Sequence, residues 1–152
     1  MKPKSYLKLL SRFLNIPGIW VQDYQIIDDI GLVFKLEPQN PEAICPHCQI
    51  PSSRLVRHHR YLIKDLPLST HAVYLQVNRR QFTCDCCQKN FTEELDYVNR
   101  QKNYTKRFAS HIVGQVLDSN IESVAKRNGL SEGEVKSMFE EIKKNILKSQ
   151  KI

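Results

Sequence analysis

The chain has 152 residues, of which 41% are hydrophobic, and Lys and Arg outnumber Asp and Glu by 23 to 16, for a formal net charge of +7. This length accommodates one or two small domains and excludes a large catalytic domain. The positive charge favours a polyanionic partner, although charge alone is weak support. The N-terminus lacks the apolar core of a secretory signal and no long apolar run follows, so we expect a reducing compartment and no membrane partner.

Residues 1–40 predict a small helix followed by a β-hairpin. Residues 4–15 place three leucines at helical spacing, and a Pro-Gly pair then ends the helix. Two β-rich runs follow at 20–27 and 32–36, and the Asp-Asp-Ile-Gly between them suits a hairpin turn.

Two cysteine pairs are the most specific motif of the chain. Cys45 and Cys48 lie in the run C-P-H-C, and Cys84 and Cys87 lie in the run C-D-C-C. Each C-x-x-C presents two thiolates from one tight turn, and two facing turns complete a tetrahedral four-sulfur site. In a reducing compartment such pairs bind metal more often than they form disulfides. We therefore expect a ribbon with a structural Zn²⁺ over residues 41–98.

Other ligands in this region stay open. Cys86 is an alternative within the second pair, but the C-x-x-C spacing favours the outer cysteines and leaves Cys86 as a spare, accessible thiol. His47, His58 and His59 are weaker candidates, because a histidine near such a turn is more often a surface residue. The same thiolates suit iron, but iron proteins of this type are usually small and acidic, which favours zinc here.

The spacer between the two pairs must itself be folded, because it is roughly twice as long as the usual 15–20 residues. Residues 71–83 alternate Val73, Leu75 and Val77 on one face, which predicts a strand that runs into the second pair. The mixed polar and apolar run 53–59 predicts a second strand.

Residues 99–152 predict helices with recognisable caps. Apolar periodicity indicates a helix over about 105–118, and the polar run Asp118-Ser119-Asn120 then caps the next helix. Ser131 followed by Glu134 fits a capping box at the start of a third helix.

The second and third of these helices fit a helix-turn-helix. Ala125 supplies a small residue where the helices cross, Gly129 supplies the turn, and Val135 supplies a core contact. A plain α-hairpin in a bundle shows a similar pattern and remains the alternative. The whole chain is thus predicted to be α+β, with divisions at 1–40, 41–98 and 99–152.

Candidate DNA contacts are mostly basic residues from three parts of the chain. The ribbon arginines are placed to follow phosphates, the linker residues to contact the backbone, and the second helix of the motif to enter the major groove. Glu132 and Glu134 at the start of that helix repel phosphates, so affinity must come from elsewhere. The candidates are Arg54, Arg57, Arg60, Arg79, Arg80, Lys102, Lys106, Arg107, Lys126, Arg127, Lys136 and Ser137.

Four motifs together resemble the N-terminal region of bacterial insertion-sequence transposases of the ISL3 family. They are C-P-x-C, the run R-Y-x-x-x-D-L-P-L at 60–68, the run R-R-x-F-x-C at 79–84, and F-T-E at 91–93. The resemblance implies a zinc ribbon and helix-turn-helix that bind the terminal inverted repeats of double-stranded transposon DNA, in the bacterial cytoplasm at the nucleoid.

Full-length relatives carry a following catalytic domain with three metal-binding carboxylates, which this chain does not reach. We therefore expect a DNA-binding chain and not an enzyme, either a truncated remnant or a stand-alone regulator. A homodimer or the full-length transposase is the expected protein partner. A zinc-ribbon adaptor for other proteins is the rival reading, since Val135, Phe139, Ile142 and Ile146 lie at helical spacing and offer a partner face.

Overall fold

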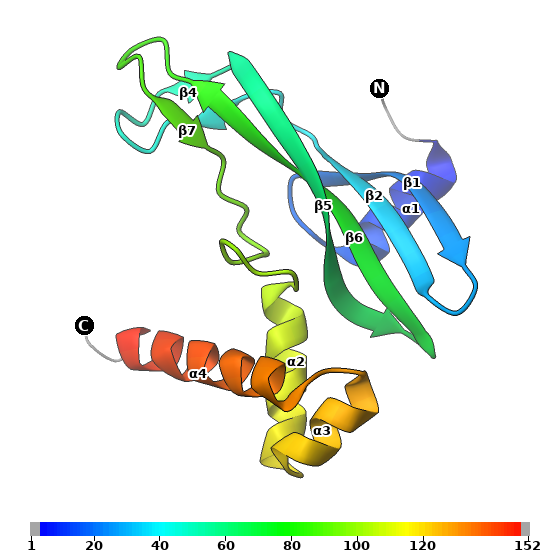
Figure 1. Ribbon diagram of the computed structural model, residues 1–152. Coiled ribbons are helices and arrows are strands. Elements are labelled where there is room, and N and C mark those ends of the chain that lie inside the picture. Colours follow the sequence, from blue (N-terminus) through cyan, green and yellow to red (C-terminus); the bar gives the residue numbers. More distant parts are fainter. Residues whose placement is uncertain (1–3, 150–152) are drawn as a thin grey trace.

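The computed structural model describes residues 4–149 and has the α+β architecture that the sequence predicts (Figure 1). A long twisted sheet carries the cysteine turns at one end, and three helices gather near its other end. The elements are α1 (Ser5–Leu14), β1 (Ile19–Ile27), β2 (Gly31–Pro38), β3 (Ala43–Ile44), β4 (Pro51–Ser52), β5 (Leu55–Leu68), β6 (His71–Thr83), β7 (Asn90–Thr92), α2 (Lys106–Leu117), α3 (Ile121–Asn128) and α4 (Glu132–Ser149).

The main sheet has the strand order β1-β2-β6-β5, and the short β7 pairs with β6. β1 and β2 form the predicted hairpin. β2 then pairs with β6 in parallel, with Leu32 opposite Val73. Gly31 permits this approach, because its φ is +133° and a Cβ there would collide with the carbonyl of Ala72. The predicted division at residue 40 therefore falls between two segments that share one sheet.

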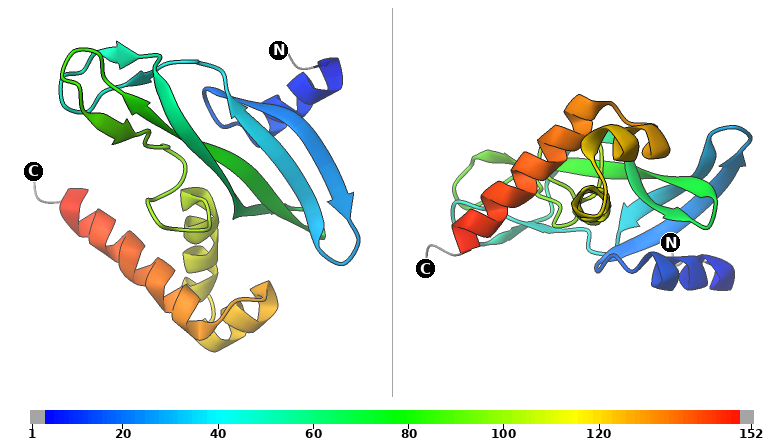
Figure 2. Two further views of the ribbon diagram at one scale, coloured as in Figure 1. Left: turned by 45° about the horizontal axis from the view of Figure 1, so that its top comes forward. Right: turned by 90° about the horizontal axis from the view of Figure 1, so that it is seen from below.

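One hydrophobic core lies against this sheet. Val73, Leu75 and Val77 are buried along β6, which confirms the alternation in the sequence. α1 adds Leu7 to the same core, and the Ser11 hydroxyl accepts a hydrogen bond of 2.8 Å from the β1 backbone. Figure 2 shows α1 and the C-terminal helices on opposite sides of the strands.

Side-chain caps mark the starts of the three C-terminal helices, and those of α3 and α4 agree with the sequence prediction. Thr105 and Asn120 accept hydrogen bonds from backbone N–H groups three residues further on, at 3.2 and 2.8 Å. Ser131 and Glu134 form the reciprocal capping box, at 3.1 and 3.2 Å. Gly129 ends α3 with a φ of +66°. The turn between α3 and α4 is therefore set by local chemistry.

A second core holds these helices together. Val124 and Val135 are fully buried between them, and Phe139 and Ile142 pack against the same cluster. Three residues of the suggested partner face therefore belong to the chain's own core, and the fourth, Ile146, is 53% exposed.

A buried carboxylate joins the sheet to the helices. Asp65 on β5 is 2% exposed, and it accepts a hydrogen bond of 2.7 Å from Thr105 and two, of 2.9 and 2.5 Å, from the Arg107 guanidinium. Arg107 also donates to the carbonyl of Leu14 at the end of α1, at 2.7 Å. One ion pair thus contacts three elements that are distant in sequence.

Backbone and side-chain bonds reinforce this junction. Lys64 on the edge of the sheet bonds through its N–H and its carbonyl to the segment 103–105, at 2.8 and 2.9 Å. Glu141 on α4 accepts hydrogen bonds from Tyr104, at 2.8 Å, and from Asn99. The linker before α2 is therefore bonded to the sheet on one side and to α4 on the other.

The environment of Asp65 makes its contribution to stability depend on pH. Burial opposes its ionisation, but hydrogen bonds from Arg107 and Thr105 outweigh this and lower its pKa. Asp65 in turn raises the pKa of Arg107. Because the folded pKa lies below the unfolded value of about 3.9, the stabilisation is complete above that value and is lost as pH falls through the folded pKa.

Asp65→Ala is expected to lower the free energy of unfolding at neutral pH by about 3 kcal/mol, since it leaves the half-buried Arg107 guanidinium and the buried Thr105 hydroxyl without their shared acceptor. Urea denaturation measures this, and the difference from wild type should shrink below about pH 4. Asp96→Ala, at an exposed carboxylate, serves as the control and should change stability by less than about 0.5 kcal/mol. Equal stability of the two variants would contradict the role of Asp65.

Candidate metal centre and nucleic-acid interface

The four predicted cysteines converge at the end of the sheet. Their sulfur atoms all lie within 4.8 Å of one another. Cys45 and Cys87 are 3.7 Å apart, and Cys48 and Cys84 are 3.3 Å apart. A tetrahedral ion with metal–sulfur bonds of about 2.3 Å separates its ligands by about 3.8 Å, so these dimensions suit a four-thiolate metal site.

The two cysteine turns have the same backbone design. In the first, the N–H of Gln49 donates to the carbonyl of Cys45, and in the second the N–H of Gln88 donates to that of Cys84, both at 2.9 Å. Gln49 and Gln88 have φ values of +62° and +60°. The sequence carries this signal as a repeated C-x-x-C-Q, which the interpretation of the cysteines alone did not use.

The clustered thiols differ in pKa, although they lie close together. Backbone N–H donation from Cys87 lowers the pKa of Cys84 to about 7, whereas the hydrogen bond with Cys84 raises the pKa of Cys48 to about 12. A cation at the centre favours the thiolate form of all four, because metal binding displaces the protons.

A small core with two aromatic rings packs against the cysteine turns. Phe82 and Phe91 stack with ring centroids 5.8 Å apart. Arg80 lies 5.0 Å above the Phe82 ring and forms two hydrogen bonds with Glu93, at 2.8 and 2.6 Å. It also donates to the carbonyl of Asn40 at 2.8 Å. Arg80 is buried and fully engaged, so the DNA surface proposed below omits it.

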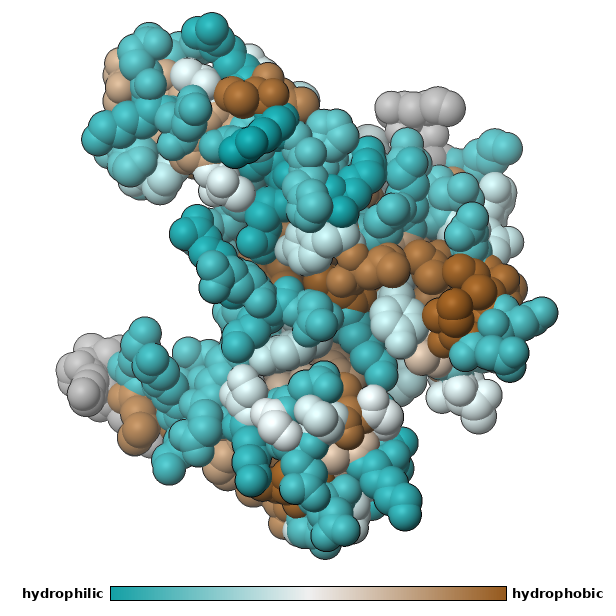
Figure 3. Space-filling view, viewed as in Figure 1, coloured by the Kyte–Doolittle hydropathy of each residue, from teal (hydrophilic) through white to brown (hydrophobic). Residues whose placement is uncertain are grey.

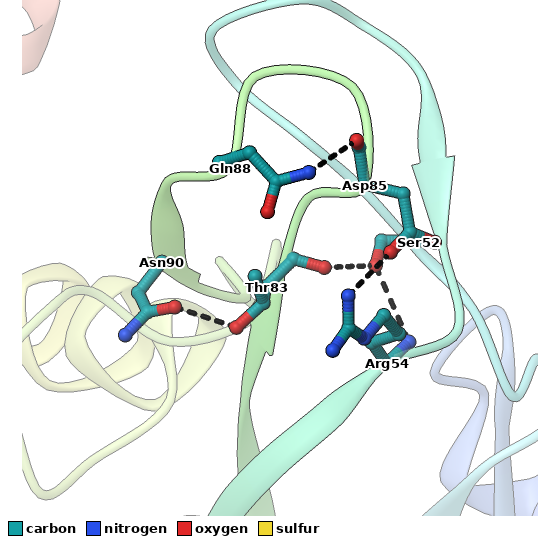
Figure 4. A network of polar contacts seen from close by, with 6 residues as sticks. All are labelled: Ser52, Arg54, Thr83, Asp85, Gln88 and Asn90. Carbon is teal, nitrogen blue, oxygen red and sulfur yellow. Dashed lines mark hydrogen bonds and ion pairs between the residues drawn. The ribbon is translucent and has the colours of Figure 1, made fainter.

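Polar contacts join the second cysteine turn to the strand beside it (Figure 4). Ser52 donates to the carbonyl of Thr83 at 2.6 Å. Arg54, a predicted DNA contact, pairs with Asp85 inside the turn at 3.0 Å, and both side chains are exposed. Figure 4 shows Gln88 directed at Asp85 from the other side, bonding to its carbonyl at 2.8 Å.

Cys86 is exposed, while the four sulfurs of the centre are buried or half-buried. Among residues 4–149, the four cysteines are the one group of His, Cys, Asp and Glu whose ligand atoms gather closely enough for a metal. The choice of Cys45, Cys48, Cys84 and Cys87 over Cys86 and the histidines therefore agrees with the geometry.

The other predicted ribbon arginines differ in their surroundings. Arg60 is half-buried and pairs with Glu37 at 2.5 Å. Arg57 is exposed and donates to the side chain of Gln81. Arg79 lies 5.6 Å over the ring of Tyr61. Arg107 is held by Asp65, as described above, and belongs with Arg80 among the structural arginines.

The predicted residues of the helical region remain available to a ligand. Lys106 is exposed at the start of α2, and Lys102 is half-buried in the linker. The remaining candidates are exposed at the end of α3 and on α4, and they are Lys126, Arg127, Lys136 and Ser137. Of these, Ser137 also lies beside the Tyr104 hydroxyl of the linker.

Two further lysines extend this face. Lys143 and Lys144 are exposed on α4, seven and eight residues after Lys136. That separation returns to the same side of a helix, so their spacing contained the signal that sequence reasoning missed. Beyond its acidic first turn, the outer face of α4 therefore carries three lysines against one exposed carboxylate, that of Glu140.

Comparison with known families accounts for both parts. Residues 41–87 match the zinc finger of the transposases IS204, IS1001, IS1096 and IS1165, and residues 93–142 match the helix-turn-helix domain of the ISL3 transposase family. Both matches are to modules of ISL3-type transposases, a zinc finger for the ribbon and a helix-turn-helix for the helical part. The matched helix-turn-helix contains α3, the Gly129 turn and the start of α4.

One curated ISL3-type relative is the transposase for insertion sequence element IS1001 of Bordetella parapertussis. It is 26% identical over 121 residues, which cover 78% of this chain and 30% of the relative. The chain thus spans about a third of that relative's length. No solved structure matches the chain. None of the described helices is long and apolar enough to cross a membrane.

Purified protein is expected to carry about one zinc per chain, measured by elemental analysis. Cys45→Ser should lose most of this metal, because three remaining sulfurs leave the tetrahedral set incomplete. Cys86→Ser is the matched control and should retain about one zinc. Loss of metal from the Cys86 variant alone would overturn the ligand assignment. Chelation should also unfold the ribbon end, seen as lost amide protection around Phe82.

Proposed function

We propose that this chain is the end-binding part of an ISL3-type transposase, and that it recognises terminal inverted repeats through its zinc ribbon and helix-turn-helix. The observation that carries this is the attachment of a helix-turn-helix, with a basic outer face on α4, to a four-cysteine ribbon through the Asp65 junction. The occupant of the metal centre is proposed to be zinc, because four thiolates in a closed site are its preferred structural set.

The second helix of the motif is proposed to read the major groove. Recognition helices place their N-terminal residues against base edges, which assigns Lys136 and Ser137 to this role. The positive end of the helix dipole offsets part of the charge of the acidic first turn, and Glu134 is also held by a hydrogen bond within the capping box. Lys143 and Lys144 further along α4 are proposed to contact phosphates.

Binding is proposed to take place without strand cleavage by this chain. The assembled site offers sulfur ligands, which suit zinc, whereas metal-assisted strand cleavage uses oxygen-bound Mg²⁺. Incubation with supercoiled plasmid carrying the inverted repeats and Mg²⁺ should therefore leave the plasmid intact. Zinc-dependent or Mg²⁺-dependent nicking would contradict this. Action at the bacterial nucleoid, alone, as a homodimer or with a full-length transposase, is part of the same proposal.

A binding titration tests end recognition. Zinc-loaded protein is measured against the inverted repeat that flanks its gene and against a scrambled duplex, each at low and near-physiological salt. A preference for the repeat that persists at the higher salt supports the proposal, because nonspecific binding is mainly electrostatic and weakens steeply with salt. Equal affinities for both duplexes would reject it.

Variants of α4 distinguish residues that recognise bases from residues that contact phosphates. Lys143→Ala with Lys144→Ala should weaken binding to both duplexes by about tenfold and reduce the salt slope by about 2. Lys136→Ala should instead reduce the preference for the repeat. Lys4→Ala with Lys8→Ala removes the same charge from exposed positions of the N-terminal segment and is the control. An equal effect of the control pair would show that net charge alone drives binding.

A further inference from the structure

A basic hollow lies between the ribbon and the helical bundle. Figure 3 shows the molecule recessed on this side, between the lobe with the cysteine turns and the lower lobe with α4. Within the linker region there is a cavity of about 240 Å³, lined among others by Arg79 from β6, Arg100 from the linker and Lys106 from the start of α2. Three cations from three segments therefore border one small space.

The carboxylates around this cavity do not neutralise it. Glu93 is already bonded to Arg80 at 2.8 and 2.6 Å. Glu94 is 85% exposed, and it lies 4.0 Å from Arg100, which is itself 66% exposed. An ion pair that open to solvent contributes little. The cavity therefore keeps an excess of positive charge.

Arg79 is the least exposed of these three cations, and one of its hydrogen-bond donors is unpaired. Its Nε atom is buried without a hydrogen-bond partner. No carboxylate of residues 4–149 lies within ion-pair distance of it, in contrast to Arg54, Arg60, Arg80 and Arg107. Burying an unpartnered donor is costly, and a guanidinium matches the oxygens of a phosphate.

Hydrogen bonds and a ring contact hold the residues that line the cavity. Asn99 at its rim is bonded to Glu141 on α4, and the N–H of Lys106 donates to the carbonyl of Tyr97 at 2.9 Å. Arg79 is held from the sheet side by the Tyr61 ring. A ligand seated here would touch the sheet, the linker and the first helix of the bundle at once.

We propose that this cavity is a seat for one phosphate of the DNA backbone, bound by Arg79, Arg100 and Lys106. The inference rests on the proposed DNA-binding function and adds a fixed contact between the two modules. Such a contact carries no sequence information itself, but it sets the register of the helix-turn-helix on the duplex relative to the ribbon.

A scan with neutral backbone linkages tests the seat. Methylphosphonates are introduced one at a time along the duplex that wild-type protein binds best. Neutralising the seated phosphate should weaken wild-type binding by about tenfold. Arg100→Ala with Lys106→Ala should bind the natural duplex more weakly and should show no further loss at that one position, while losses elsewhere in the scan persist. This coupling identifies a direct contact.

Two controls keep the outcome decisive. Arg100 and Lys106 are exposed, so the double variant should have the melting temperature of the wild type. Arg79→Met is a second seat variant, which keeps an aliphatic side chain against the Tyr61 ring and removes the charge. The Lys4→Ala, Lys8→Ala protein should retain the wild-type scan. If wild type binds DNA but the seat variants respond to every methylphosphonate as wild type does, the seat is refuted and the proposed function stands. If wild type binds no DNA, both fail.

Discussion

The arrangement of this molecule depends on the ion pair between Asp65 and Arg107. A carboxylate that is 2% exposed requires partners that compensate for its lost hydration, and Arg107 and Thr105 supply them. Thr105 also caps α2 and Arg107 also holds the end of α1. The direction of α2, and with it that of the whole helical bundle, therefore follows from satisfying one buried charge on the edge of the sheet.

The motifs that resemble those of ISL3-type transposases are largely structural in this chain. Asp65 belongs to the R-Y-x-x-x-D-L-P-L run and forms the junction, while Arg80 and Glu93, from two other motifs, pair beneath the cysteine turns. Phe82 and Phe91 stack beside them. The residues of these motifs thus build the support of the metal centre and the attachment of the helices, and the exposed residues of α4 lie outside the motifs.

Local chemistry was readable from the sequence, and distant pairing was not. The hairpin, the strand into the second cysteine pair and the caps of α3 and α4 each depend on a few neighbouring residues, and the structure has them. The parallel pairing of β2 with β6 depends on residues about forty positions apart, and no periodicity reveals it. Arg80 and Arg107 look like any other surface arginine in the sequence, because their partners, Glu93 and Asp65, are recognisable only once the chain has folded.

The length of β6 has a consequence for the spacing of contacts along a duplex. The helical bundle attaches beside Lys64, which pairs with Tyr74 near the start of β6, and the cysteine turn begins at Cys84, where the strand ends. About ten residues of strand separate these points, or about 33 Å. One turn of B-form DNA advances about 34 Å. The length of strand between the two attachment points therefore matches one helical turn, so a straight duplex bound as proposed would meet the ribbon and the base of the helical bundle on the same side.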